Sequence, residues 1–152
     1  PKAYGSSLTN PRITTDFSEA LIELVTSPNK DLNNCLKELE NIVYFCLKNT
    51  DDDFWPASIP MSIEDESAIP IAEYGHSNSG KLKKLYRIGL SHRYGSMMQT
   101  VSGIHYNFSF DDRLFEEWAK NEGGSLREFK DKKYLSLVRN FRRNAWFITF
   151  LF

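Results

Sequence analysis

Long hydrophobic runs, a surplus of one charge and a cysteine framework are all missing from this sequence of 152 residues. The longest uncharged apolar run, residues 145–152, is far too short to cross a bilayer, and no signal peptide is visible. Nineteen basic and twenty acidic residues leave a net charge of −1, so no overall field favours nucleic acid or an anionic membrane. We therefore expect a cytoplasmic protein with neither kind of partner, in which any anion site is local.

The only two cysteines are Cys35 and Cys46. They are eleven residues apart on what reads as one helix, about 16 Å along its axis, which is too far for a disulfide. The sequence also has no GxxxxGKS/T phosphate loop and no internal repeat. With 41% hydrophobic and 14% aromatic residues, it is typical of a globular domain with a real core.

The stretch 74–110 contains most of the functional information. A polar cluster at residues 77–79 offers an N-cap for a basic helix over residues 79–94, and Gly95 suits its end. Helical spacing places five residues on one stripe of this helix: Leu82, Leu85, Tyr86, Gly89 and Leu90. The lysines and Arg87 largely take the other side.

After Gly95 the pattern changes to the two-residue period of a strand, over Met97 to Phe110. Gln99, His105 and Asn107 share its polar face, and Gly103 leaves room between them for a ligand or a neighbouring backbone. These polar side chains could instead be hydrogen-bonded groups inside a sheet. Three of them on one face weaken that alternative.

The remaining segments are mostly helical. Asp31 can cap the helix 31–48, whereas 12–26 fits either a helical stripe or strand composition. A loop with three prolines and two acidic runs follows at 49–73, where solvated charges are expected. Asp111 or Asp112 can cap a helix that ends near Gly123, and another helix begins near Ser125.

Three motifs resemble the bacterial glutamate–cysteine ligase family. They are YGxSNxGxxKxLYRxGLxxRYGxxMQTxSGxHYNFS at 74–109, TDFxEALxE at 15–23 and WPxSxP at 55–60. The resemblance runs from about Gly5 to the last residue, and it implies an internal part of a catalytic chain several times longer. Residues 1–152 would then be part of a single catalytic domain whose two flanks lie outside this sequence.

The resemblance also implies an α+β fold of the glutamine-synthetase-like kind. Its antiparallel active-site sheet would be built from Arg12–Thr26 and Met97–Phe110 and covered by helices. For 12–26, periodicity alone slightly favours a helix. The prediction of two strands around an irregularity near 18–20 rests on the resemblance.

The implied reaction joins the γ-carboxylate of L-glutamate to the amine of L-cysteine through a γ-glutamyl phosphate made from ATP. Such chemistry needs Mg²⁺ or Mn²⁺ between carboxylate and phosphate oxygens. The resemblance suggests Asp16, Glu23 and His105 as metal ligands, although the His105 imidazole could equally donate a hydrogen bond to phosphate. It places the cysteine substrate beside Phe17, Tyr86, Leu90 and Gln99. Lys81, Lys84 and Arg87 could help attract phosphates, although an exposed helix face has the same composition.

Two alternatives remain open at this point. The protein could be another carboxylate–amine ligase of the same fold, or a non-catalytic interaction domain that uses the basic helix 81–93. The balanced net charge argues against the second. If the family resemblance holds, we expect the 152-residue chain on its own to be inactive and to aggregate through its apolar end.

Overall fold

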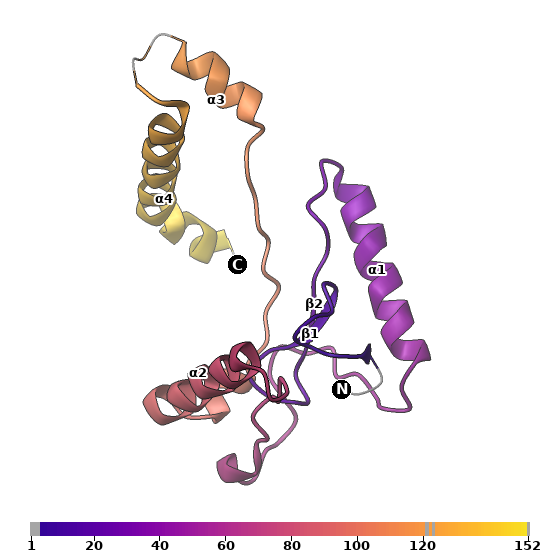
Figure 1. The fold of residues 1–152 in the computed structure, drawn as a ribbon. Helices are drawn as coiled ribbons and strands as arrows, with labels where there is room; N and C mark the ends of the chain where they lie inside the picture. Colours follow the sequence, from indigo (N-terminus) through magenta and orange to yellow (C-terminus); the bar gives the residue numbers. More distant parts are fainter. Residues whose placement is uncertain (1–3, 121, 123, 152) are drawn as a thin grey trace. The chain divides into compact units, whose positions relative to one another are not determined.

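The computed structural model describes residues 4–120, 122 and 124–151. The chain divides into two compact units, Pro1–Ile104 and His105–Phe152 (Figure 1). The first unit contains the strands β1 (Ile13–Thr15) and β2 (Ile22–Leu24), the helices α1 (Leu32–Lys48) and α2 (Asn78–Tyr94), and the 3-10 helices η2 (Glu66–Ala68) and η3 (Met97–Thr100). The second unit contains α3 (Asp112–Ala119) and α4 (Leu126–Leu151).

A two-stranded antiparallel hairpin forms the centre of the first unit, with Thr14 opposite Glu23. Ile13 and Thr15 point into the core, and their neighbours face outward. This confirms two strands over 12–26, with the expected irregularity between them. The helical periodicity was misleading because burial against other elements, and not local spacing, decides which side chains of a short strand are covered.

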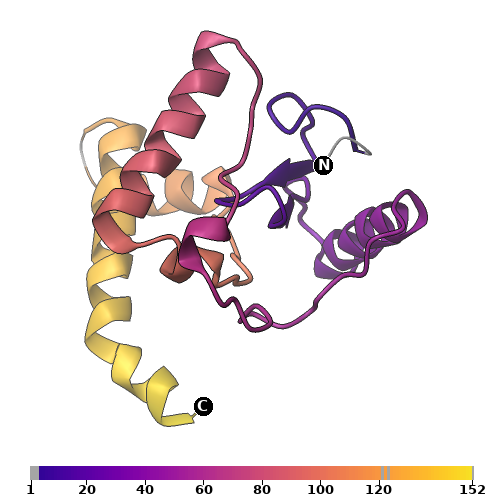
Figure 2. The same ribbon diagram turned by 90° about the horizontal axis from the view of Figure 1, so that it is seen from below.

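Helix α1 begins at its predicted cap, where the Asp31 side chain accepts a hydrogen bond from the Asn34 amide at 2.9 Å. Ile42 and Cys46 on this helix pack against Ile13 of β1 and form the core of the first unit. Cys35 and Cys46 are both free thiols, as their separation predicted. In both views the hairpin lies between α1 and α2 (Figures 1 and 2).

Helix α2 also follows the prediction at both ends. The Ser77 side chain accepts from the Gly80 amide, and Gly95 ends the helix with a φ of 82°. Gly80 is buried, and a Cβ atom there would lie 2.4 Å from the Tyr74 carbonyl oxygen. The start of α2 can therefore approach the preceding chain closely only because residue 80 has no side chain.

The strand predicted over Met97–Phe110 is not observed. Its first residues form η3, and residues 101–110 have no regular secondary structure. A strand requires a neighbour that pairs its backbone N–H and C=O groups, and no described residue forms a sheet with this segment. Its alternating pattern is real, but the pattern alone cannot supply a partner strand.

The second unit is built on aromatic side chains. Asp111 caps α3, and Ser125 and Glu128 exchange hydrogen bonds in a capping box at the start of α4. Four rings form the contact between the helices and the preceding chain: Phe110, Phe115, Trp118 and Tyr134. Helix α3 ends at Ala119, before the predicted stop near Gly123, which lies outside the described residues. Among the helices described, none is long and apolar enough to cross a membrane.

Candidate active site

Two predicted carboxylates lie on the outward face of the hairpin. The Asp16 amide donates to the Leu21 carbonyl at 2.9 Å, which continues the pairing one residue beyond β1. Because Thr14 is opposite Glu23, Asp16 and Glu23 are diagonal neighbours on one face, about 7–8 Å apart. Both side chains are exposed, and within the described residues neither carboxylate has a hydrogen bond or ion pair. Their oxygens are accessible to a ligand.

The turn after Asp16 is held by the segment that leads into α2. The Ala72 amide donates to the Phe17 carbonyl at 2.9 Å, and the Glu19 amide donates to the Pro70 carbonyl at 3.0 Å. In return, the Glu19 side chain accepts from the Glu73 amide at 2.9 Å. Phe17, predicted to contact cysteine, is only 2% exposed. The backbone of this turn is therefore fixed on both sides.

Tyr74 and Arg87 hold the end of β1 from the other side. The Tyr74 hydroxyl lies 2.6 Å from the Thr15 carbonyl oxygen and 3.1 Å from that of Asp16. Arg87 donates from Nε to the Asp16 carbonyl at 2.5 Å and from Nη2 to the Thr15 carbonyl at 3.4 Å. Its guanidinium also lies over the Tyr74 ring, 4.6 Å from the ring centroid. We call these two side chains the carbonyl clamp.

Burial raises the pKa of the Tyr74 hydroxyl above its usual value. The negative charges of Asp16 and Glu23 act in the same direction, whereas the bond to Thr15 and the Arg87 charge lower the pKa. Tyrosine is protonated at neutral pH in any case, and the raised pKa extends this protonation to more alkaline pH. Its hydroxyl is therefore a hydrogen-bond donor to the carbonyls, as the distances require.

The three predicted phosphate-binding side chains have different surroundings. Arg87 donates hydrogen bonds from all three of its nitrogens to backbone carbonyls. One of these is the Lys83 carbonyl, 3.2 Å from Nη1. Lys84 forms an ion pair with Glu73. Lys81 is exposed, and within the part of the chain that the structure describes it has no partner. Lys81 is thus the most available of the three for an anion.

The other predicted cysteine-binding residues lie on α2 and η3, which contact each other. Tyr86 and Leu90 are one helical turn apart on α2, with Tyr86 64% exposed. Gln99 is half-buried on η3. The start of η3 is held by Glu66, whose carboxylate accepts from the Met97 amide at 2.9 Å.

His105 is the first residue of the second unit and is exposed. Asp16 and Glu23 belong to the first unit, so a shared metal site with His105 stays a prediction. Among the described residues, no group of three or more His, Cys, Asp or Glu side chains could hold a metal ion. Of the three predicted metal ligands, the first unit contains the two carboxylates, Asp16 and Glu23.

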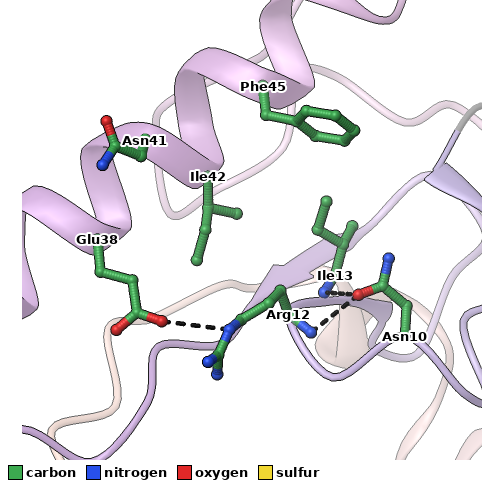
Figure 3. Close-up of a pocket in the computed structure, with 7 residues that line it drawn as sticks. All are labelled: Asn10, Arg12, Ile13, Glu38, Asn41, Ile42 and Phe45. Carbon is green, nitrogen blue, oxygen red and sulfur yellow. Dashed lines mark hydrogen bonds and ion pairs between the residues drawn. The ribbon is translucent and has the colours of Figure 1, made fainter.

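A separate pocket of about 370 Å³ lies between β1 and α1 (Figure 3). It is lined by Asn10, Arg12, Ile13, Glu38, Asn41, Ile42 and Phe45. The Nε of Arg12 is 3.2 Å from a Glu38 carboxylate oxygen, and Asn10 accepts from two backbone amides. None of the predicted site residues lines this pocket, so it is distinct from the carboxylate face.

Sequence reasoning missed two side chains near the predicted site, Tyr74 and Glu66. In the sequence, Tyr74 is only the first residue of a motif, and Glu66 belongs to an acidic run that predicts a solvated loop charge. Both act on residues far away in sequence, so periodicity could not reveal them. Two glycines are the only sequence features that indicate these close contacts. Gly80 leaves space for the Tyr74 carbonyl, and Gly95 leaves space for the Glu66 carboxylate.

The family model and the similar proteins of known function all point to one family. The family model for glutamate–cysteine ligase matches residues 1–152. A glutamate–cysteine ligase of Saccharophagus degradans is 47% identical over 155 residues, and one of Pseudomonas aeruginosa is 46% identical. Each alignment covers 100% of this chain and 29% of the relative. The chain therefore spans less than a third of the length of these curated relatives.

Solved structures agree with this assignment. A glutamate–cysteine ligase from Francisella tularensis in complex with AMP matches with a TM-score of 0.87 at 40% identity, covering 97% of this chain and 29% of that one. A bifunctional glutathione synthetase from Pasteurella multocida matches with a TM-score of 0.81 at 31% identity, covering 96% of this chain and 19% of that one. This chain belongs to the glutamate–cysteine ligase family.

Proposed function

We propose that this chain is part of an enzyme that joins L-glutamate, through its γ-carboxyl group, to L-cysteine at the expense of ATP. The family match over residues 1–152 carries this proposal. The AMP bound to the Francisella tularensis relative is consistent with a nucleotide substrate. The proposed product, γ-glutamylcysteine, would be the first intermediate of glutathione biosynthesis.

We propose Asp16 and Glu23 as metal ligands, with His105 as a third from the second unit. Carboxylate oxygens are the donors that Mg²⁺ and Mn²⁺ prefer, and these two are exposed, without partners in the described residues, and on one face. When bound, the metal would neutralise phosphate and carboxylate oxygens during phosphoryl transfer. The donor set therefore fits a hard divalent cation, although two carboxylates alone do not complete its coordination.

For the second half-reaction we propose that Tyr86, Leu90 and Gln99 receive the cysteine side chain. Phe17 is only 2% exposed, so in this structure it offers the cysteine no surface. Aromatic and aliphatic surface suits a thiol, and the Gln99 amide can orient a polar group. Lys81 and Lys84 are our candidates for attracting nucleotide phosphates, Lys84 after release from Glu73. For the complete domain we propose a glutamine-synthetase-like antiparallel sheet that includes the β1–β2 hairpin.

The decisive experiment replaces Asp16 and Glu23 by their amides, Asp16→Asn and Glu23→Gln, in the full-length ligase. We expect loss of ATP-dependent γ-glutamylcysteine formation and weaker Mn²⁺ binding, measured by the electron paramagnetic resonance of free Mn²⁺. The matched control is Glu40→Gln, an exposed carboxylate on α1, which should change neither. Unchanged Mn²⁺ binding in both site variants would refute the metal assignment.

Competition between acceptors tests the substrate. If cysteine is the acceptor, other amino acids should not support phosphate release at comparable concentrations. Equal turnover with an unrelated amine would instead favour another carboxylate–amine ligase of the same fold. Tight, strongly salt-dependent DNA binding would favour the interaction domain.

A further inference from the structure

Arg87 of the basic helix α2 makes all of its hydrogen bonds within the described residues to backbone carbonyls. Arg87 reaches the end of β1 and shares the Thr15 and Asp16 carbonyls with the Tyr74 hydroxyl. Each carbonyl oxygen thus lies within reach of one Arg87 N–H group, and the single O–H proton of Tyr74 is shared between the two carbonyls. A guanidinium offers several N–H donors in one plane, which allows a single side chain to serve two neighbouring carbonyls.

This arrangement fixes the backbone of Asp16 at both of its polar groups. Its amide is bonded to the Leu21 carbonyl at 2.9 Å, and its carbonyl is held by the clamp. The next carbonyl, that of Phe17, accepts from the Ala72 amide. With the backbone fixed on both sides, the direction of the Asp16 Cα–Cβ bond is set before any ligand arrives. The Asp16 carboxylate itself has no partner in the described part of the chain.

We infer that Tyr74 and Arg87 are positioning residues for the metal-binding carboxylate Asp16, and that Arg87 is not a phosphate ligand. The inference rests on the proposed function. A carboxylate held in its binding direction loses little conformational freedom when a cation binds, and residues that orient metal ligands typically change metal affinity by 10–100-fold. Arg87 could reach a phosphate only by giving up bonds to Thr15 and Asp16.

Tyr74→Phe and Arg87→Lys in the full-length ligase test this inference. The first keeps the ring under the guanidinium and removes only the hydroxyl. The second keeps the positive charge and removes the planar fork. We expect both to weaken Mn²⁺ binding by about tenfold, measured by electron paramagnetic resonance without nucleotide. Because both side chains act on the same carbonyls, the double variant should weaken Mn²⁺ binding by less than the product of the two single-variant factors.

The matched control is the pair Arg93 and Tyr94 on the same helix. There the guanidinium lies 5.1 Å from the ring centroid, but within the described residues neither side chain forms a hydrogen bond to the turn that follows Asp16. Arg93→Lys and Tyr94→Phe should leave Mn²⁺ binding unchanged. Circular dichroism and the melting temperature show whether each variant is folded, and Arg87→Lys remains decisive if Tyr74→Phe does not fold.

The possible results separate the inference from the function on which it rests. If Asp16→Asn weakens Mn²⁺ binding but neither clamp variant does, the inference is wrong and the proposed function stands. If Arg87→Lys raises only the KM for ATP and Tyr74→Phe has no effect, Arg87 binds phosphate and the inference is also wrong. If Asp16→Asn leaves Mn²⁺ binding unchanged, Asp16 is not a metal ligand and the inference fails with that assignment.

Discussion

At the scale of single residues, two glycines of α2 differ sharply in their surroundings. A Cβ atom on Gly80 would lie 2.4 Å from the Tyr74 carbonyl oxygen, whereas one on Gly89 would meet nothing within 4 Å. We expect Gly80→Ala to lower the free energy of unfolding by about 1–3 kcal/mol, because a backbone atom cannot move aside cheaply. Gly89→Ala should raise it by about 0.5–1 kcal/mol through helix propensity.

Calorimetric melting of the full-length ligase can compare the two variants. Gly80→Ala should melt below the parent protein and Gly89→Ala at or above it. Equal melting temperatures would show that the start of α2 does not approach the Tyr74 backbone as closely as the structure indicates.

The protonation of Tyr74 gives a second prediction at this scale. Burial raises its pKa in the folded state, so above about pH 10 the unfolded chain loses this proton first. The stability that protonated Tyr74 contributes is present below pH 10 and is lost as the pH rises toward the folded-state pKa. Phenolate absorbance of the parent protein minus that of Tyr74→Phe should therefore have its midpoint above pH 10. A midpoint at the ordinary value would contradict the burial of the hydroxyl.

At the scale of elements, α2 and η3 are proposed to form one wall of the cysteine pocket. Tyr86→Ala and Gln99→Ala should raise the KM for cysteine about tenfold or more and change the KM for ATP little, because tenfold corresponds to about 1.4 kcal/mol, the size of one lost contact. Steady-state kinetics with each substrate varied separately measures this.

Leu82→Ala is the matched control for these variants. Leu82 lies one turn before Tyr86 on α2 and is 67% exposed, but it is outside the proposed pocket. It should change neither KM. Equal increases for cysteine and ATP in the Tyr86 and Gln99 variants would indicate general structural damage, not a specific wall of the pocket.

At the scale of the whole molecule, the chain covers 29% of the length of its curated relatives. We expect the 152-residue chain alone to form no γ-glutamylcysteine, because two carboxylates and one imidazole cannot balance the charge of bound metal ions and a triphosphate. Positioning supplies much of phosphoryl-transfer catalysis. Product analysis by mass spectrometry checks this, and turnover by a soluble monomer of this length would contradict the proposal.

The isolated chain should also self-associate. Many apolar side chains of α4 are exposed, among them Phe141, Trp146 and Phe150 at 60%, 66% and 79%. Exposed apolar surface on this scale marks a contact face or an aggregation risk. Static light scattering should show particles larger than a monomer, and replacing these three residues with serine should reduce their size.

Local sequence alone determined the ends of most helices in this protein. Caps at Asp31 and Ser77 and the glycine stop at Gly95 depend on neighbours within four residues, so they are visible without a fold. The family motifs also identified Asp16 and Glu23, and the hairpin register then placed both on one face. Whether they bind metal remains a prediction.

Tertiary structure decided what depends on distant neighbours. Within 12–26, Ile13–Thr15 and Ile22–Leu24 are strands because they pair with each other and pack on α1, although the spacing of this segment also fits a helix. Residues 101–110 alternate like a strand, yet no described segment pairs with them as a sheet. The carbonyl clamp joins residues up to 72 positions apart. Periodicity reports only a residue's local geometry, whereas pairing, burial and long-range hydrogen bonds arise when the chain folds back on itself.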